Sequence, residues 1–307
     1  MNDPATPGPS VTPLGLRRSA PAKINLSLKI LGRRDDGYHL LDSLVAFADI
    51  GDRVSAAPAG DLSLCVTGPR AGDLAGLPSD DNLVLRAARA LRRLSGVRAG
   101  AALTLEKHLP AAGGIGGGSS DAAAALRALT TLWNVAPDPA ALAEAALTLG
   151  ADVPVCLACE PARMGGIGER LTPVGPLAPA GVLLVNPGVA TPTGTVFRAL
   201  RGRISAPSGT LGPLGPTARD LAATLRGLGN DLTDPAIETT PSVGSVLQAL
   251  TAEPESLFAA MSGSGATCFA LTEDRASAEA LAARLRGTAP GAWWIAAGAL
   301  LTEGVPE

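Results

Sequence analysis

The chain has no net positive charge and few aromatic residues with which to bind a large anionic partner. Its 307 residues carry a formal net charge of −3, and aromatic residues make up 3% of them. Surfaces that bind nucleic acid or anionic lipid need clustered Lys and Arg, and single-stranded nucleic acid also needs rings for stacking. We therefore expect no nucleic-acid partner, and an anionic ligand must be held by a few local groups.

Long hydrophobic runs are missing as well. The longest stretch without a charged residue, 171–197, is interrupted by five prolines. Proline breaks helices, and a membrane-spanning helix needs about 20 consecutive apolar residues. We expect no membrane span and no membrane partner.

Cysteine and histidine are scarce, with four and two residues. Cys156 and Cys159 form a lone C-x-x-C motif without a second pair. This count indicates no disulfide framework and no tetrahedral zinc site, and the identity of any metal ligand stays open. The expected state is buried, reduced thiols in a cytoplasmic protein.

Lysine is much rarer than arginine in this chain. Only Lys23, Lys29 and Lys107 are lysines among 25 basic residues. A compact ammonium is not equivalent to a planar guanidinium. Each lysine is therefore a candidate for a specific role.

The 46% apolar and 17% charged residues indicate a globular protein with a sizeable core. Apolar and polar residues alternate over 22–30, which predicts a half-buried strand with Lys23 and Asn25 on its polar face. Because strands and helices mix without a regular βαβ repeat, the predicted class is α+β. Further strands are predicted at 40–48, 61–67, 101–106, 182–185, 268–271 and 293–300, and helices at 82–94, 120–133, 138–150, 217–228, 241–250 and 275–286.

Changes of composition suggest three parts. Residues 1–18 contain four prolines and no apolar run, which predicts a disordered extension. We expect one domain at 19–170 and a second at 171–307, where a Pro- and Gly-rich stretch begins. The segment 205–216 has low complexity.

A glycine-rich segment, 110–121, is the strongest chemical signal. Glycines let backbone N–H groups approach a phosphate, and the N-terminus of a following helix attracts anions. We expect Ser119 to N-cap that helix. The spacing fits neither the Walker A motif nor G-x-G-x-x-G, so the segment is either another type of phosphate-binding loop or a tight strand-to-helix turn. Its glycines are Gly113, Gly114, Gly116, Gly117 and Gly118.

Two other segments could contribute to a site. Residues 261–266 form a Ser- and Gly-rich loop between apolar runs, which is also ordinary loop composition. Asp152 lies in an apolar segment, where an unpaired charge is unfavourable. It therefore needs a cationic partner or a chemical role, unless it simply caps a helix.

Three of these segments, 20–26, the glycine-rich loop and 261–266, resemble in order and spacing the motifs of the GHMP family of small-molecule kinases. Residues 36–39, 81–83, 150–155, 187–189 and 230–232 are similar to the branch that phosphorylates diphosphocytidyl methylerythritol. The resemblance covers almost the whole chain after the extension. The sequence departs from the family at Ala111 and Ala112, where Met-Gly is common, and in the long 205–216 segment.

The resemblance implies a two-domain α+β fold, with an N-terminal half like ribosomal protein S5 domain 2 and a ferredoxin-like C-terminal half. The implied reaction transfers the γ-phosphoryl group of ATP, accompanied by Mg²⁺, to the 2-hydroxyl of the small-molecule substrate, cytidyl methylerythritol, in isoprenoid precursor synthesis. Asp152 matches the family's catalytic base and Lys23 the lysine beside it. An ammonium there would stabilise the carboxylate and the charge that develops on the hydroxyl oxygen.

The resemblance also implies two sets of binding residues. Tyr38 and Phe197 match a pair that sandwiches the cytosine, and Ser119 or Ser120 could reach Mg²⁺ or a phosphate. A solvated side chain for Lys107, core packing for Phe197 and a surface loop for His39 are the simpler alternatives. The implied ATP-binding residues are Asn82, Lys107, Pro110, Gly113, Gly114, Gly116, Gly117, Gly118, Ser119 and Ser120, and the implied substrate-binding residues are Asn25, Tyr38, His39, Thr193 and Phe197.

Two other functions are compatible with this resemblance. The chain could be a GHMP kinase for mevalonate, homoserine or a sugar, but these substrates have no pyrimidine for Tyr38 and His39 to bind. It could also be a non-catalytic nucleotide sensor, against which Lys23 and Asp152 argue. The sequence carries no signal of an oligomeric state.

Overall fold

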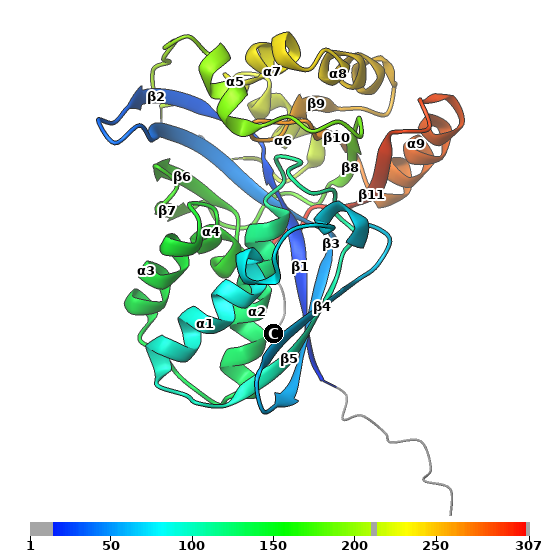
Figure 1. Ribbon diagram of the computed structural model, residues 1–307. Helices are drawn as coiled ribbons and strands as arrows, with labels where there is room; N and C mark the ends of the chain where they lie inside the picture. The colour runs from blue at the N-terminus through cyan, green and yellow to red at the C-terminus, as the bar shows by residue number, and fades with distance from the viewer. Residues whose placement is uncertain (1–14, 210–213, 305–307) are drawn as a thin grey trace, which may run out of the picture.

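Two β-sheets form the scaffold of the computed structural model, which describes residues 15–209 and 214–304 (Figure 1). In the first sheet the order is β4-β5-β3-β6-β7, and β1 and β2 also pair with β3. The long strand β3 is thus the centre of this sheet. Its strands are β1 (Leu16–Asn25), β2 (Lys29–Arg33), β3 (His39–Ala59), β4 (Leu62–Thr67), β5 (Gly100–Glu106), β6 (Ala162–Gly166) and β7 (Arg170–Pro173).

Helices cover one face of this sheet (Figure 1). Helix α1 begins where the Asn82 side chain accepts a hydrogen bond from the Val84 N–H at 2.9 Å, and ends at Gly96 with φ +68°. The apolar faces of α1 and α2 pack against β1, β3 and β5 in one core cluster. The helices of this half are α1 (Leu83–Ser95), α2 (Gly117–Leu132), α3 (Pro139–Leu149) and α4 (Val153–Ala158), and short 3₁₀ turns occupy Ala71–Leu74 and Ser79–Asp81.

The second sheet is antiparallel, with the order β11-β8-β10-β9. Its strands are β8 (Gly181–Asn186), β9 (Phe258–Met261), β10 (Cys268–Thr272) and β11 (Trp294–Ala299). The helices of this half are α5 (Thr193–Ala199), α6 (Ala218–Leu225), α7 (Thr233–Thr239), α8 (Ser242–Ala252) and α9 (Arg275–Thr288).

Strand β8 is buried along its whole length because both of its faces are covered. Leu183 and Val185 pack with α7, α8 and α9, whereas Val182 and Leu184 pack with Ile24 of β1 and its neighbours in the first half. A continuous apolar core therefore joins the two halves. The chain also returns to the first half at its end, where the Leu301 N–H donates to the Phe47 carbonyl at 2.8 Å.

The mixed α+β prediction is confirmed, and most predicted elements are present. The strand predicted at 22–30 is interrupted at residues 26–28, and its first part, residues 22–25 of β1, is buried on both faces rather than half-buried. Ser119 does not cap α2, which begins two residues earlier, at Gly117. The short elements α4, α5, α7, β6, β7 and β9 were not predicted, since four to seven residues carry too little periodicity.

The disordered extension was predicted to reach residue 18, but Leu16–Arg18 already pair with β3 as part of β1. Residues 1–14 of the predicted extension lie outside the described residues. The boundary expected at residue 170 stays a prediction, although β7 continues the first sheet to Pro173. Part of the 205–216 segment is also described. The Ser208 N–H donates to Asp42 of β3 at 2.8 Å, so residues up to 209 lie against the first sheet. In the described part of the chain, no helix has the length and apolarity to cross a membrane.

Candidate active site

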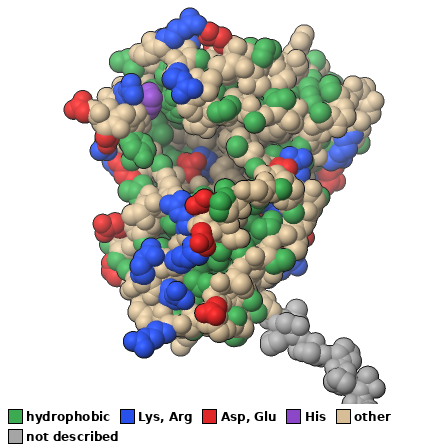
Figure 2. All heavy atoms as spheres, viewed as in Figure 1, with side chains coloured by type: hydrophobic (Ala, Val, Ile, Leu, Met, Phe, Trp, Pro, Cys, Tyr) green, Lys and Arg blue, Asp and Glu red, His purple; other side chains and the backbone are tan. Residues whose placement is uncertain are grey.

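A cavity of about 1190 Å³ opens between the two halves. Figure 2 shows it as a hollow with charged groups inside. The expected site residues that line it are Lys23, Asn25, Tyr38, His39, Gly113, Gly114, Gly116, Gly117, Gly118, Ser119, Asp152, Thr193 and Phe197. Asn82, Lys107, Pro110 and Ser120 are buried outside this lining.

The glycine-rich loop is locked against the 261–266 loop. The Ser262 hydroxyl accepts from the Asn25 N–H at 3.0 Å and donates to the Gly114 carbonyl at 2.9 Å. A Cβ on Gly114 would lie 2.6 Å from the Ser262 carbonyl oxygen, and its φ of +73° is unfavourable for other residues. The Ser- and Gly-rich loop 261–266 therefore holds the glycine-rich loop in place. The two segments are about 150 residues apart, and apart from the two motifs themselves nothing in the sequence predicted that they would touch.

Lys23 and Asp152 form an ion pair at the glycine-rich loop. The Lys23 Nζ lies 2.9 Å from Asp152 Oδ2, and the lysine is buried whereas 37% of the Asp152 side chain is exposed. Asp152 precedes α4, but its side chain makes no capping hydrogen bond, so the helix-cap alternative is wrong and the expected cationic partner is confirmed. The Lys23 N–H donates to the Ile115 carbonyl at 2.9 Å. An ammonium, an accessible carboxylate and the glycine-rich loop thus meet in one place.

Asn25 presents a free acceptor beside this pair. Its Nδ2 donates to Ser43 Oγ at 2.7 Å, while its Oδ1 is buried without a hydrogen-bond partner among the described residues. A Cβ on Gly263 would lie 3.2 Å from that oxygen, so the glycine leaves room next to it. Because a buried unpaired acceptor is unfavourable, the site is suited to a ligand that donates a hydrogen bond there.

An aromatic group lies at the other end of the cavity. The His39 ring stacks on Phe197 with centroids 4.5 Å apart, whereas Tyr38 is 56% exposed. Phe197 is only partly buried and packs against the core of the second half. Burial, and secondarily the charge of Arg33, lowers the pKa of His39 from its usual value. The imidazole is therefore neutral at pH 7.

Three arginines that line this end, Arg33, Arg198 and Arg203, were not singled out from the sequence. Arginine is so abundant in this chain that single positions do not stand out. The Thr193 hydroxyl lies 3.0 Å from that of Ser264, which also lines the cavity. These residues come from both halves of the chain.

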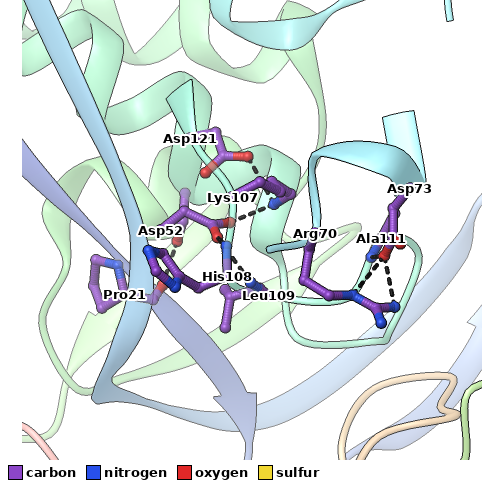
Figure 3. A network of polar contacts seen from close by, with 10 residues as sticks. Pro21, Asp52, Arg70, Asp73, Lys107, His108, Leu109, Ala111 and Asp121 are labelled. Atoms are coloured by element: carbon purple, nitrogen blue, oxygen red, sulfur yellow. Dashed lines mark hydrogen bonds and ion pairs between the residues drawn. The ribbon is translucent and has the colours of Figure 1, made fainter. Parts of the chain in front are cut away.

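Lys107 does not point into the cavity. Its ammonium is paired with Asp52 and with Asp121, the latter at 3.0 Å (Figure 3). The interpretation of Lys107 as a solvated surface residue is therefore wrong, because its side chain is 2% exposed. Ser120 is also engaged, since its hydroxyl donates to the Pro21 carbonyl at 2.6 Å.

Comparisons with known proteins identify the family. Residues 82–160 match the GHMP kinases N terminal domain, and residues 207–291 match the GHMP kinases C terminal model. A 4-diphosphocytidyl-2-C-methyl-D-erythritol kinase of Paramagnetospirillum magneticum is 53% identical over 92% of this chain and 98% of its own. The chain belongs to this family of GHMP kinases. The kinase of the same name from Cereibacter sphaeroides is 55% identical over 90% of this chain and 96% of its own.

Solved structures of GHMP kinases share the fold. A 4-(cytidine 5′-diphospho)-2C-methyl-D-erythritol kinase superposes with a TM-score of 0.75 at 35% identity, covering 95% of this chain and all of that one. A homoserine kinase from Cytophaga hutchinsonii reaches a TM-score of 0.70 over 98% of this chain, but at 17% identity it shows only the common fold.

The described residues of this GHMP kinase contain no cluster of three or more His, Cys, Asp or Glu that could hold a metal ion. Cys156, Cys159 and Cys268 are buried as expected, but Cys65 is exposed. Burial raises the pKa of the Cys156 thiol to about 12. This thiol is therefore protonated and unreactive at neutral pH.

The charge of Asp121 predicts how stability depends on pH. Burial, with the like charge of Asp52 adding to it and Lys107 opposing, raises the pKa of Asp121 from 3.8 to about 8. The folded chain thus keeps a proton that the unfolded chain loses, and this contribution to stability disappears as the pH rises through about 8. We expect the free energy of unfolding of the wild type to fall between pH 5 and pH 8 relative to Asp121→Asn, which cannot ionise. Urea unfolding of both proteins across this range measures the difference, and a constant difference would contradict the assignment.

Proposed function

We propose that this chain transfers the γ-phosphoryl group of ATP to the 2-hydroxyl of 4-diphosphocytidyl-2-C-methyl-D-erythritol. The observation that carries the proposal is the Lys23–Asp152 ion pair, which faces the glycine-rich loop in one cavity. Kinases of that name are about half identical to this chain over nine-tenths of its length. A mevalonate, homoserine or sugar substrate has no such support, and a sensor would not need the ion pair.

ATP would bind with its phosphates at Gly113, Gly114, Gly116, Gly117 and Gly118. Gly114 and Gly116 have positive φ angles that residues with a side chain rarely adopt, and the N-terminus of the 16-residue helix α2 adds a partial positive charge. Ser119 lines the same end of the cavity. Asn82 and Pro110 would contribute to the nucleotide pocket through backbone and shape, because the Asn82 side chain caps α1 and Pro110 is buried.

Asp152 would act as the general base. It accepts the proton of the 2-hydroxyl as that oxygen bonds to the γ-phosphorus and the bond to the bridging oxygen of ADP breaks. Lys23, 2.9 Å from the carboxylate, orients it and stabilises negative charge on the attacking oxygen. The products are ADP, the phosphorylated alcohol and one proton on Asp152.

Mg²⁺ would arrive with ATP rather than occupy a site made by the protein alone. Mg²⁺ keeps several waters and often binds through substrate phosphates and one or two oxygen ligands. The Ser119 hydroxyl at the cavity lining fits that role, whereas the Ser120 hydroxyl already donates to Pro21. When bound, the ion neutralises phosphate charge.

The aromatic end would recognise the cytidine. Tyr38 and Phe197 would stack on the pyrimidine, and neutral His39 offers both a donor and an acceptor to its edge. In this structure His39 covers the Phe197 face, so the imidazole would turn toward the pyrimidine edge when the ring enters. Asn25 Oδ1 would accept from a hydroxyl of the methylerythritol, with Thr193 nearby.

Removing the proposed base tests the mechanism. We expect Asp152→Asn to keep the fold and ATP binding but to lose about 10²- to 10⁴-fold in kcat, because the amide cannot accept the proton. Steady-state kinetics with ATP and the cytidyl substrate measure this loss. Asp231→Asn, which alters a similar ion pair with Lys29 outside the cavity, is the control. Near-wild-type turnover of Asp152→Asn would exclude Asp152 as the base.

Truncating the exposed tyrosine tests substrate recognition. We expect Tyr38→Ala to raise KM for the cytidyl substrate by an amount equivalent to about 1–3 kcal/mol of stacking, with little change in kcat or in KM for ATP. Since Tyr38 is more than half exposed, its loss should not lower the melting temperature. Leu77→Ala, at a comparably exposed position outside the cavity, is the matched control. An unchanged KM for the cytidyl substrate would exclude the proposed stacking.

A further inference from the structure

A closed cluster of charges lies beneath the glycine-rich loop (Figure 3). The Lys107 ammonium pairs with Asp52 and Asp121, and none of the three side chains is more than 4% exposed. The residues come from three elements: Asp52 from β3, Lys107 from the position after β5, and Asp121 from the first turns of α2. None of the three residues is among those that line the cavity.

The contacts of this cluster go to both ends of the loop. Asp52 Oδ1 accepts from the backbone N–H groups of His108 at 2.5 Å and Leu109 at 2.8 Å, just before the loop. Asp121, the last residue of the glycine-rich segment 110–121, accepts from Lys107 through its Oδ2 at 3.0 Å. A Cβ on Gly117 would lie 3.3 Å from the Lys107 Nζ, so the end of the loop lies directly on the ammonium.

Stability alone does not explain such a cluster. Burying charges is unfavourable, and a buried ion pair often stabilises a protein no more than apolar side chains of the same volume would. Here one lysine contacts two acidic side chains, of which Asp121 keeps its proton near neutral pH, and Asp121 Oδ1 has no hydrogen-bond partner among the described residues. The polar contacts of these groups fix geometry, because each one holds β3, the residues before the glycine-rich loop or the start of α2 at a defined distance from its neighbour.

We propose that Asp52, Lys107 and Asp121 are positioning residues that hold the glycine-rich loop in its ATP-binding shape without contacting ATP. This inference rests on the proposed function, in which the loop binds the phosphates. In this proposal Lys107 supports ATP binding through the glycine-rich loop, instead of by the direct nucleotide contact that the family resemblance implied.

The size of the effect follows from the population of the binding-competent loop. If the loss of the contact between Lys107 and Asp121 leaves the glycine-rich loop in its ATP-binding shape about one-tenth of the time, the apparent Kd for ATP rises about tenfold. The cytidyl end of the cavity is built by other segments, the β2–β3 hairpin and α5, so its affinity stays the same. A selective loss of ATP affinity is therefore the signature of positioning.

Two substitutions of Asp121 distinguish the effect of its hydrogen bond with Lys107 from the effect of its ionisable carboxyl group. Asp121→Asn and Asp121→Leu both remove the ionisable carboxyl group and keep the number and branching of the side-chain heavy atoms, but only asparagine keeps an oxygen that accepts from Lys107. We expect Asp121→Leu to raise the Kd for ATP roughly tenfold, with KM for the cytidyl substrate and kcat changed less than about twofold. We expect Asp121→Asn to stay within about twofold of the wild type in all three quantities. Asp121→Ala, a good helix former, replaces the leucine variant if that protein does not fold.

Titration calorimetry of the full chain with ATP measures the Kd without any acceptor substrate. A failure of the proposed reaction would thus show as absent turnover in the wild type, whereas a failure of this inference shows in ATP binding by the variants. Arg163→Met is the control, because it breaks the buried Asp42 ion pair of the same strand β3, away from the loop. Equal Kd values for the leucine and asparagine variants, or a lower melting temperature with unchanged ATP affinity, would overturn the proposal.

Discussion

The buried hydroxyl of Ser262 joins three of the segments that line the cavity: β1, the glycine-rich loop and the 261–266 loop. It accepts a backbone hydrogen bond from β1 at Asn25 and donates one to the glycine-rich loop at Gly114. Gly114 and Gly263 permit this approach, because a side chain at either position would collide with the facing backbone. The orientation of Lys23, of the loop and of the unpartnered Asn25 oxygen all depends on this junction.

Two of the chain's lysines are buried, and their surroundings give them different roles. Lys23 pairs with one carboxylate that remains accessible from the cavity, so the pair can meet a substrate. Lys107 contacts the acidic side chains of Asp52 and Asp121 in the interior, so its charge is satisfied inside the protein. Lys29, the third lysine, pairs with Asp231 and ties β2 to the second half. The same ammonium group thus serves at a candidate reaction centre, under a binding loop and in a joint between the halves.

Much of the fold could be predicted from local patterns. Helix α3 has Asp138 as N-cap, Pro139 in its first turn and Gly150 at its end, and each signal acts within a few residues. The start of α2 was misplaced because Gly116, in a left-handed conformation, takes the cap position that the serine was expected to fill. The short helices α4, which Asp152 directly precedes, and α5, which carries Thr193, were not predicted because six or seven residues carry too little periodicity.

The sequence by itself determined the α+β class, the glycine-rich loop and the residue types of the candidate site, since glycine conformation, helix capping and hydrophobic alternation are local properties. Only the tertiary structure decided which side chains meet. Lys23 and Asp152 are about 130 positions apart and touch because β1 and α4 both pack against α2. Lys107 carries the same charge as Lys23, yet it faces Asp52 and Asp121 instead of the cavity. Whether a charged group is exposed or enclosed depends on how distant segments pack, and no local pattern encodes that packing.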